Sequence, residues 1–185
     1  MPLPSSDTDS ELLPPVNGDG HLDIVVADLP SQLFFGDGQR GFMRDESSPA
    51  IDSDTTCVRH AGGDFDGDGV DDLYAVCGAT SRSDFDLSDK LFLADSRLHF
   101  QQDHTNPAAY VRNSANHVLA EDLDGDGIKD LVISTGATWP RNANYVYRGT
   151  ATGTFVRDEA STRHADTWWA LAVDVNRKDP HATSS

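Results

Sequence analysis

Four of the carboxylates in residues 64–73 lie at fixed offsets of a short loop, and this crowding constrains the fold more than any other feature of the chain. The loop reads Asp-Phe-Asp-Gly-Asp-Gly-Val-Asp-Asp-Leu, with acids at positions one, three, five and nine. Such crowding is repulsive unless a cation compensates it. Hard oxygens at alternating positions suit Ca²⁺, which takes about 6 to 8 oxygen ligands. We therefore predict a calcium site whose ligands are the side chains of Asp64, Asp66, Asp68 and Asp72 and the backbone carbonyl of Val70.

The same pattern recurs twice. Residues 122–131 read Asp-Leu-Asp-Gly-Asp-Gly-Ile-Lys-Asp-Leu, and the predicted ligands are the side chains of Asp122, Asp124, Asp126 and Asp130 and the carbonyl of Ile128. An earlier copy at residues 15–24 has Pro15 in place of the first acid, and its predicted ligands are Asn17, Asp19, Asp23 and the carbonyl of His21. The sequence thus predicts two calcium sites and a third, weaker one.

Two other interpretations of the loops explain less. An EF-hand needs a bidentate glutamate at position twelve and flanking helices, but Ala75 and Ile133 occupy that position. Simple hairpin turns need one Asp-Gly pair each, not four acids at fixed offsets. The segments that follow, residues 73–77 and 131–134, are short and rich in β-branched and aromatic residues, as strands are. The loops are therefore predicted to lie at the tips of β-hairpins.

Aligned on position one, the three loops are separated by 49 and 58 residues, which is a period typical of β-propellers and β-arrays. Each unit contains four strand-like segments, and four antiparallel strands make one propeller blade. We predict an all-β fold of about three such blades plus one extra strand, an incomplete propeller. The predicted strands are 57–63, 117–121 and 168–173 before the loops; 22–27, 72–77 and 129–134 after them; then 32–35, 90–94 and 144–148; and finally 41–44, 99–102 and 154–157.

The loops at 64–73 and 122–131 resemble those of FG-GAP/VCBS repeats, the calcium-binding blades of the integrin α-chain N-terminal propeller and of many secreted bacterial proteins. Segments 35–42 and 147–155 resemble the Gly-x-Phe hairpin of that family. The resemblance implies calcium hairpins between the first two strands of each blade, closed propellers of about seven blades, and a role in cell adhesion. Since three blades do not close a ring, we expect a fragment of a longer propeller.

The repeats divide the chain into predicted segments. Residues 1–14 and 177–185 are expected to be disordered, and 15–176 to hold the repeats, at about 15–55, 56–113 and 114–165, with the start of a fourth at 166–176. Lys178 stands where the central acid of a fourth loop belongs, so no metal is expected there. Residues 106–113 are the least strand-like stretch.

Charge and hydrophobicity exclude several classes of partner. The chain has 31 acidic residues against 14 lysines and arginines, a net charge of −17. This argues against nucleic acid, because phosphates would be repelled, and against anionic membrane surfaces. No apolar run approaches the roughly 18 residues of a membrane helix, so no membrane insertion is expected. No signal peptide is visible. Millimolar calcium nevertheless implies an extracellular or cell-surface location, with the leader outside this chain or the chain an internal piece of a longer one.

Cys57 and Cys77 flank the second loop, seven residues before Asp64 and five after Asp72. On neighbouring strands of a hairpin they could form a disulfide in an oxidising compartment, or remain two small buried residues. Because cross-strand disulfide geometry is restrictive, the second interpretation is favoured.

No catalytic motif is present in the sequence: no nucleophile elbow, phosphate loop or dinucleotide fingerprint is found.

Recognition is expected on the variable connections, since loops on a rigid scaffold carry binding. Arg82, Trp139 and Arg141 could contact a protein or carbohydrate ligand, although the favoured interpretation is that they are turn residues that cap the blade. We expect a non-enzymatic, calcium-stabilised recognition or adhesion scaffold. The alternatives are the propeller of a secreted polysaccharide-degrading enzyme, or a fragment without a function of its own.

Overall fold

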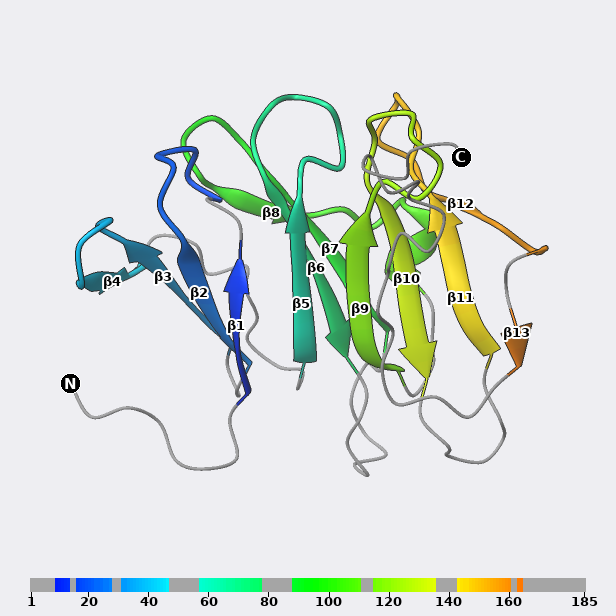
Figure 1. Ribbon diagram of the computed structural model, residues 1–185, viewed down its shortest axis with the longest axis horizontal. Helices are drawn as coiled ribbons and strands as arrows, with labels where there is room; N and C mark the ends of the chain where they lie inside the picture. Colours follow the sequence, from blue (N-terminus) through cyan, green and yellow to red (C-terminus); the bar gives the residue numbers. More distant parts are fainter. Residues whose placement is uncertain are drawn as a thin grey trace, which may run out of the picture.

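Three antiparallel β-sheets, one for each predicted repeat, form the described part of the molecule (Figure 1). This computed structural model describes residues 9–13, 16–27, 31–46, 57–77, 88–110, 115–135, 143–160 and 163–164. The first sheet has the order β1-β2-β3-β4. Its strands are β1 (Asp9–Leu13), β2 (Asp23–Ala27), β3 (Gln32–Gly36) and β4 (Phe42–Arg44).

The second and third sheets repeat this up-and-down order. The second consists of β5 (Cys57–Gly63), β6 (Asp72–Cys77), β7 (Lys90–Ala94) and β8 (Phe100–Gln102). The third consists of β9 (Ala115–Glu121), β10 (Asp130–Thr135), β11 (Ala143–Arg148) and β12 (Val156–Arg157), and β13 (Arg163–His164) also pairs with β11. The predicted all-β fold of four-stranded blades is confirmed. The predicted strand at 168–173 and the segments 166–176 and 177–185 lie outside the described residues.

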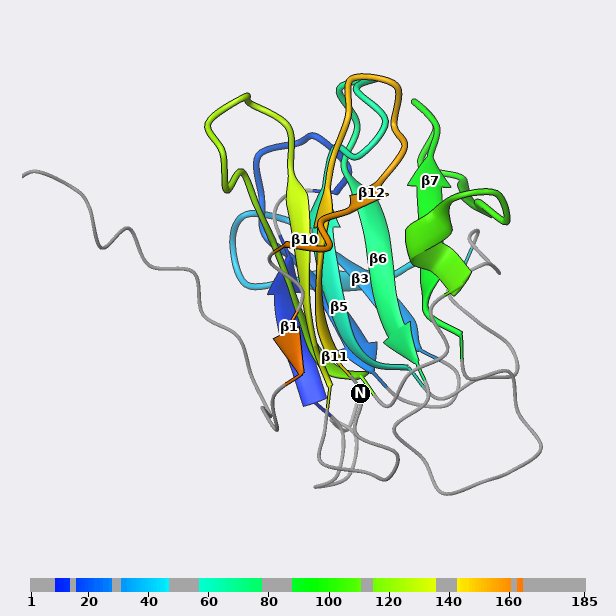
Figure 2. The ribbon, with the colours of Figure 1, turned by 90° about the vertical axis from the view of Figure 1, so that its right-hand side faces the viewer.

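The sheets stack face to face, with β1, β5 and β9 as neighbouring first strands (Figures 1 and 2). One apolar cluster joins the first and second sheets and includes Val16, Leu73 and Phe100. A second joins the second and third sheets and includes Tyr74 and Ile133. All six residues of β6 are buried, as expected for the inner strand of a sheet covered on both faces.

One segment differs from the expectations drawn from the sequence, and the least strand-like stretch agrees with them. Residues 9–13 were expected to be disordered but form β1, which pairs in unbroken register with β2. The polar segment has no strand pattern of its own, and the backbone ladder of β2 supplies the order. Between β8 and β9, residues 107–110 form a short 3-10 helix, η1 (Pro107–Tyr110). The Tyr74 hydroxyl donates a hydrogen bond of 2.7 Å to the carbonyl of Ala108 in this turn.

Cys57 and Cys77 are bonded, which corrects the expectation of two free cysteines. They are direct partners at the end of the β5–β6 hairpin, with their Cα atoms 3.9 Å apart. A register shift between Cys57 and Arg59 brings the two residues opposite each other. The sequence alone does not show this shift. The disulfide closes the end of the hairpin opposite to the acidic loop.

Among the described residues, no helix is long and apolar enough to cross a bilayer. The three acidic loops, which join β1 to β2, β5 to β6 and β9 to β10, lie at the same end of the molecule (Figures 1 and 2).

Candidate metal centres

The second loop is closed by the carboxylate of its first aspartate. Asp64 accepts hydrogen bonds from the backbone N–H groups of Gly67 (2.7 Å) and Gly69 (3.0 Å). The two glycines have φ of 81° and 88°, a left-handed conformation in which any other residue would be strained. Asp122 makes the same bonds to Gly125 (2.7 Å) and Gly127 (2.9 Å). The first aspartate of each loop therefore closes a tight turn over two glycines in the left-handed conformation.

The aspartate at position nine connects the loop to the third strand of its sheet. Asp72 accepts the N–H of Phe65 at 2.8 Å on one oxygen and the N–H of Ala94 at 2.9 Å on the other. Asp130 does the same with Leu123 (3.0 Å) and Gly149 (2.9 Å). In the first unit, Asp23 bonds Val16 and Gly36, each at 2.9 Å. All three carboxylates are buried. The same bridge thus holds every loop against its sheet.

Two groups of three aspartates bring carboxylate oxygens together, Asp64 with Asp66 and Asp72, and Asp122 with Asp124 and Asp130. Within each group the oxygens lie within 4.8 Å of one another. Oxygens bound to one Ca²⁺ at about 2.3–2.6 Å are separated by at most about 5 Å. Both groups therefore fit a divalent ion of this size.

The remaining predicted ligands of these loops lie outside the two groups. The Asp68 carboxylate accepts the N–H of Val70 at 2.8 Å, and Asp126 accepts the N–H of Ile128 at 2.8 Å. Val70 and Ile128 are half-buried at position seven of their loops. The position-five acids thus shape the turn on which the predicted carbonyl ligands lie.

In the three-aspartate group of the second loop, burial and neighbouring charges disfavour the ionised carboxylates, and a bound cation would favour them. Burial raises the pKa of Asp72 to about 7, against the opposing effect of its bonds to Ala94 and Phe65, and the charges of Asp66 and Asp64 raise it further. Burial and the neighbouring charges of Asp68 and Asp64 also raise the pKa of Asp66. In the third loop, the N–H bonds from Gly127 and Gly125 lower the pKa of Asp122.

The first loop is organised differently. The Asn17 side-chain amide donates to Asp19 at 2.8 Å, and the Asp19 carboxylate also accepts the N–H of His21 at 2.8 Å. Within the described part of this loop, no three acidic or histidine side chains converge. Pro15 lies outside the described residues. The Asn17 amide therefore occupies one oxygen of Asp19.

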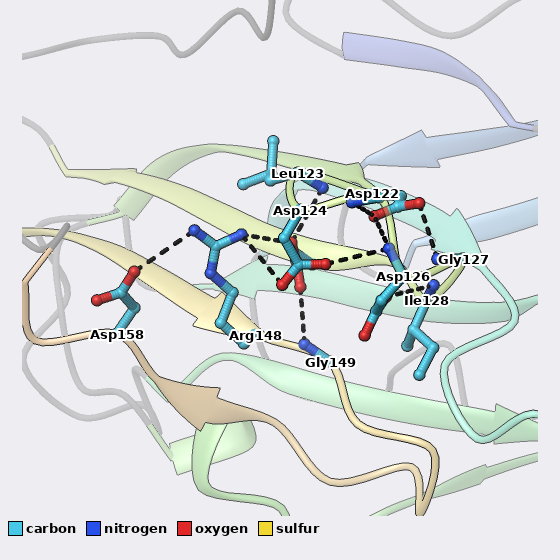
Figure 3. Close-up of polar contacts among 11 residues, drawn as sticks. Asp122, Leu123, Asp124, Asp126, Gly127, Ile128, Arg148, Gly149 and Asp158 are labelled. Carbon is cyan, nitrogen blue, oxygen red and sulfur yellow. Dashed lines mark hydrogen bonds and ion pairs between the residues drawn. The ribbon is translucent and has the colours of Figure 1, made fainter.

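The guanidinium of Arg148 contacts the three-aspartate group of the third loop (Figure 3). The Arg148 Nη1 donates to Asp130 Oδ2 at 2.8 Å and lies 3.9 Å from Asp124 Oδ2. Its Nη2 is 3.5 Å from Asp158 Oδ2. Burial lowers the pKa of Arg148, but the hydrogen bond and charge of Asp130 outweigh this and raise it overall. Arg148 and Asp158 are not among the site residues predicted from the sequence. The available signal was a basic residue at the end of a third strand, where the other units have Phe35 and Leu93.

An open hollow of about 620 Å³ lies beside the second loop and is lined by Asp66, Leu93, Asp95 and His99 among others. The His99 ring is 3.6 Å from Asp95, and Asp95 accepts the N–H groups of Arg97 and His99. Asp37 accepts N–H groups in the same way in the hairpin of the first unit. The Asp95–His99 pair is therefore part of a repeated turn. The proposed recognition residues Arg82, Trp139 and Arg141, and Lys178, lie outside the described residues.

The chain belongs to the FG-GAP-like repeat family, whose profile matches residues 16–75 and 122–177, more than half of its length. The matched ranges contain residues 16–24 of the first acidic loop and the whole of the other two. This confirms the resemblance stated from the loop motifs. A comparison with curated proteins finds no significant match.

Proposed function

We propose that the chain is a calcium-stabilised segment of a β-propeller that acts as an extracellular recognition or adhesion scaffold. The observation that carries the proposal is the pair of three-aspartate groups at equivalent hairpin tips, each compact enough for one ion. The ion would be held by Asp64, Asp66 and Asp72 in the second loop and by Asp122, Asp124 and Asp130 in the third. Its charge would offset carboxylates that are otherwise crowded together.

Metal binding would contribute mainly to stability. Each group lies on a turn already bonded to its own sheet through Asp72 or Asp130, and ion binding to a folded site adds to folding free energy. The Cys57–Cys77 disulfide supports an oxidising, extracellular setting. FG-GAP-like membership favours the same setting by analogy.

Calorimetric titration of the 185-residue chain with CaCl₂ tests the metal assignment. We expect two resolved sites, loss of one in Asp66→Asn and loss of the other in Asp124→Asn. Asp37→Asn is the matched control, because Asp37 is an exposed hairpin aspartate outside both groups. A chelator should lower the unfolding midpoint of the parent. A titration without heat, together with melting that does not respond to chelator, would rule out the calcium assignment.

The scaffold role predicts that a ligand, protein or carbohydrate, binds through the connecting loops and without turnover. Binding of the labelled chain to arrays of glycans and extracellular proteins, with Ca²⁺ and with chelator, tests this role. The competing enzymatic role has less support, because the Asp95–His99 pair beside the second loop is part of a hairpin turn that Asp37 repeats elsewhere. Release of reducing ends from polysaccharides would instead favour the enzyme.

A further inference from the structure

The two three-aspartate groups differ in one neighbour. Ala94 and Gly149 occupy the same place in their sheets, because each donates its N–H to the position-nine aspartate. The residues before them, Leu93 and Arg148, are therefore equivalent. In the first unit the equivalent residue is Phe35, which precedes the donor Gly36. Two units have an apolar side chain at this place, and the third has a cation.

Arg148 takes up bonding capacity on one carboxylate oxygen of Asp130. A carboxylate oxygen offers about two acceptor directions. Asp130 Oδ2 accepts the N–H of Leu123 at 3.0 Å and Nη1 of Arg148 at 2.8 Å. In the second loop, Asp72 Oδ2 accepts the N–H of Phe65 alone among its described contacts, so a direction remains for a metal ion.

The carboxylate of Asp158 is a second acceptor for the Arg148 guanidinium. Asp158 lies 3.5 Å from Nη2 on the side away from the loop (Figure 3). It follows β12, and its N–H donates to Val146 in β11. Arg148 could therefore give up Asp130 and keep a carboxylate neighbour.

We propose that Arg148 is a built-in counter-ion of the third loop, which competes with the metal for Asp130 and makes this site the lower-affinity one of the two. The inference rests on the proposed calcium function. Binding of an ion at Asp122, Asp124 and Asp130 releases the guanidinium from Asp130 toward Asp158. The second loop has no such competitor among the described residues and fills first.

The test uses the Asp66→Asn background, in which only the third site remains, and calorimetric titration with CaCl₂. Arg148→Leu copies the second unit and should tighten binding by about tenfold, because the ion no longer has to displace a charge-assisted hydrogen bond from Asp130. Lys129→Gln is the matched control, because it removes an equal charge from the same loop but from a side chain that pairs with Glu121. We expect the control to change affinity by less than about threefold at physiological salt.

A reciprocal variant keeps the proposal open to refutation if Arg148→Leu folds poorly. Leu93→Arg in the Asp124→Asn background should weaken the second site by about tenfold. Without metal, Arg148→Leu should also lower the unfolding midpoint, because buried Asp130 loses its counter-ion.

The possible outcomes separate the two proposals. A third-site affinity that is unchanged or weaker in Arg148→Leu, while the second site binds normally, would overturn the inference alone. Binding at neither site in the parent, and none gained in Arg148→Leu, would overturn both. Binding gained only in the variant would support the inference.

Discussion

The junction between the second and third units and the outward edges of the first and third units are built from the same repeat positions, yet they differ in burial. At the junction, Phe65 from position two of the second loop packs edge-on against Phe155, with ring centroids 5.4 Å apart. Both rings are at most 2% exposed. The equivalent outward residues are Leu123, 38% exposed, and Phe42, 49% exposed.

The apolar residue at position two of an acidic loop is therefore buried by the neighbouring unit and not by its own unit. The phenylalanine opening the fourth strand of one unit covers position two of the preceding loop, so stability comes from stacking neighbours, as in other repeat folds. The first and second units follow the same rule, because Val16 and Phe100 share one cluster.

The largest expected effect comes from truncating the buried ring at the junction. Phe155→Ala should destabilise the chain by about 3–5 kcal/mol, whereas Phe42→Ala, the same change at the same repeat position, should cost less than about 1 kcal/mol. Urea denaturation in excess CaCl₂ measures both. Equal losses would contradict the contrast.

A smaller effect is expected where the third unit touches the second loop. Gly153 has φ of 73°, and a Cβ there would lie 3.0 Å from the Cα and Cβ of Asp66. Gly153→Ala should cost about 2–3 kcal/mol, combining backbone strain and a clash. Gly18→Ala has φ of 69° but open space, and should cost about 1 kcal/mol. If both variants lose the same stability, the contact contributes nothing.

Asn106 links the second and third units through hydrogen bonds, so it tests whether polar contacts between units also contribute to stability. Its Nδ2 donates to the carbonyl of Gly153 at 2.9 Å, and its Oδ1 accepts the N–H of Phe155 at 3.3 Å. Asn106→Ala should cost about 1–2 kcal/mol, the price of leaving buried groups unpaired. Asn17→Ala removes an exposed bond within one loop and should cost less, by the same denaturation assay.

The smallest effect is expected at the outward edge of the third unit. Leu123→Ala should change the free energy of unfolding by less than about 1 kcal/mol. Leu131→Ala, at a fully buried leucine of the same unit, should cost about 2–5 kcal/mol. A large loss in Leu123→Ala would show that this edge is covered in solution.

The acidic loops and the strands that leave them could be predicted from the sequence, because fixed spacing of acids and glycines defines a turn locally. Strand β6 at Asp72–Cys77 and strand β7 at Lys90–Ala94 fall at the predicted bounds. Strand β1 could not be predicted, since its order comes from pairing with β2 and not from its own pattern.

Features that depend on how the strands pair in the sheet could not be predicted from the sequence either. The Cys57–Cys77 bond needs the shift at the start of β5. The contact of Arg148 with Asp130 joins residues 18 apart, and only the sheet brings them together. Position nine was predicted as a ligand, but its bonds to two backbone N–H groups became visible only when the third strand was in place.

Those bonds at Asp23, Asp72 and Asp130 have a consequence for how such repeats diverge. Each hairpin is held to its sheet by one carboxylate through backbone hydrogen bonds, so the other acids can differ between units. The first unit has Asn17 at the position where the other two units have an acid, and it still forms its hairpin. Substitutions can therefore accumulate in one copy and leave the architecture of the others intact.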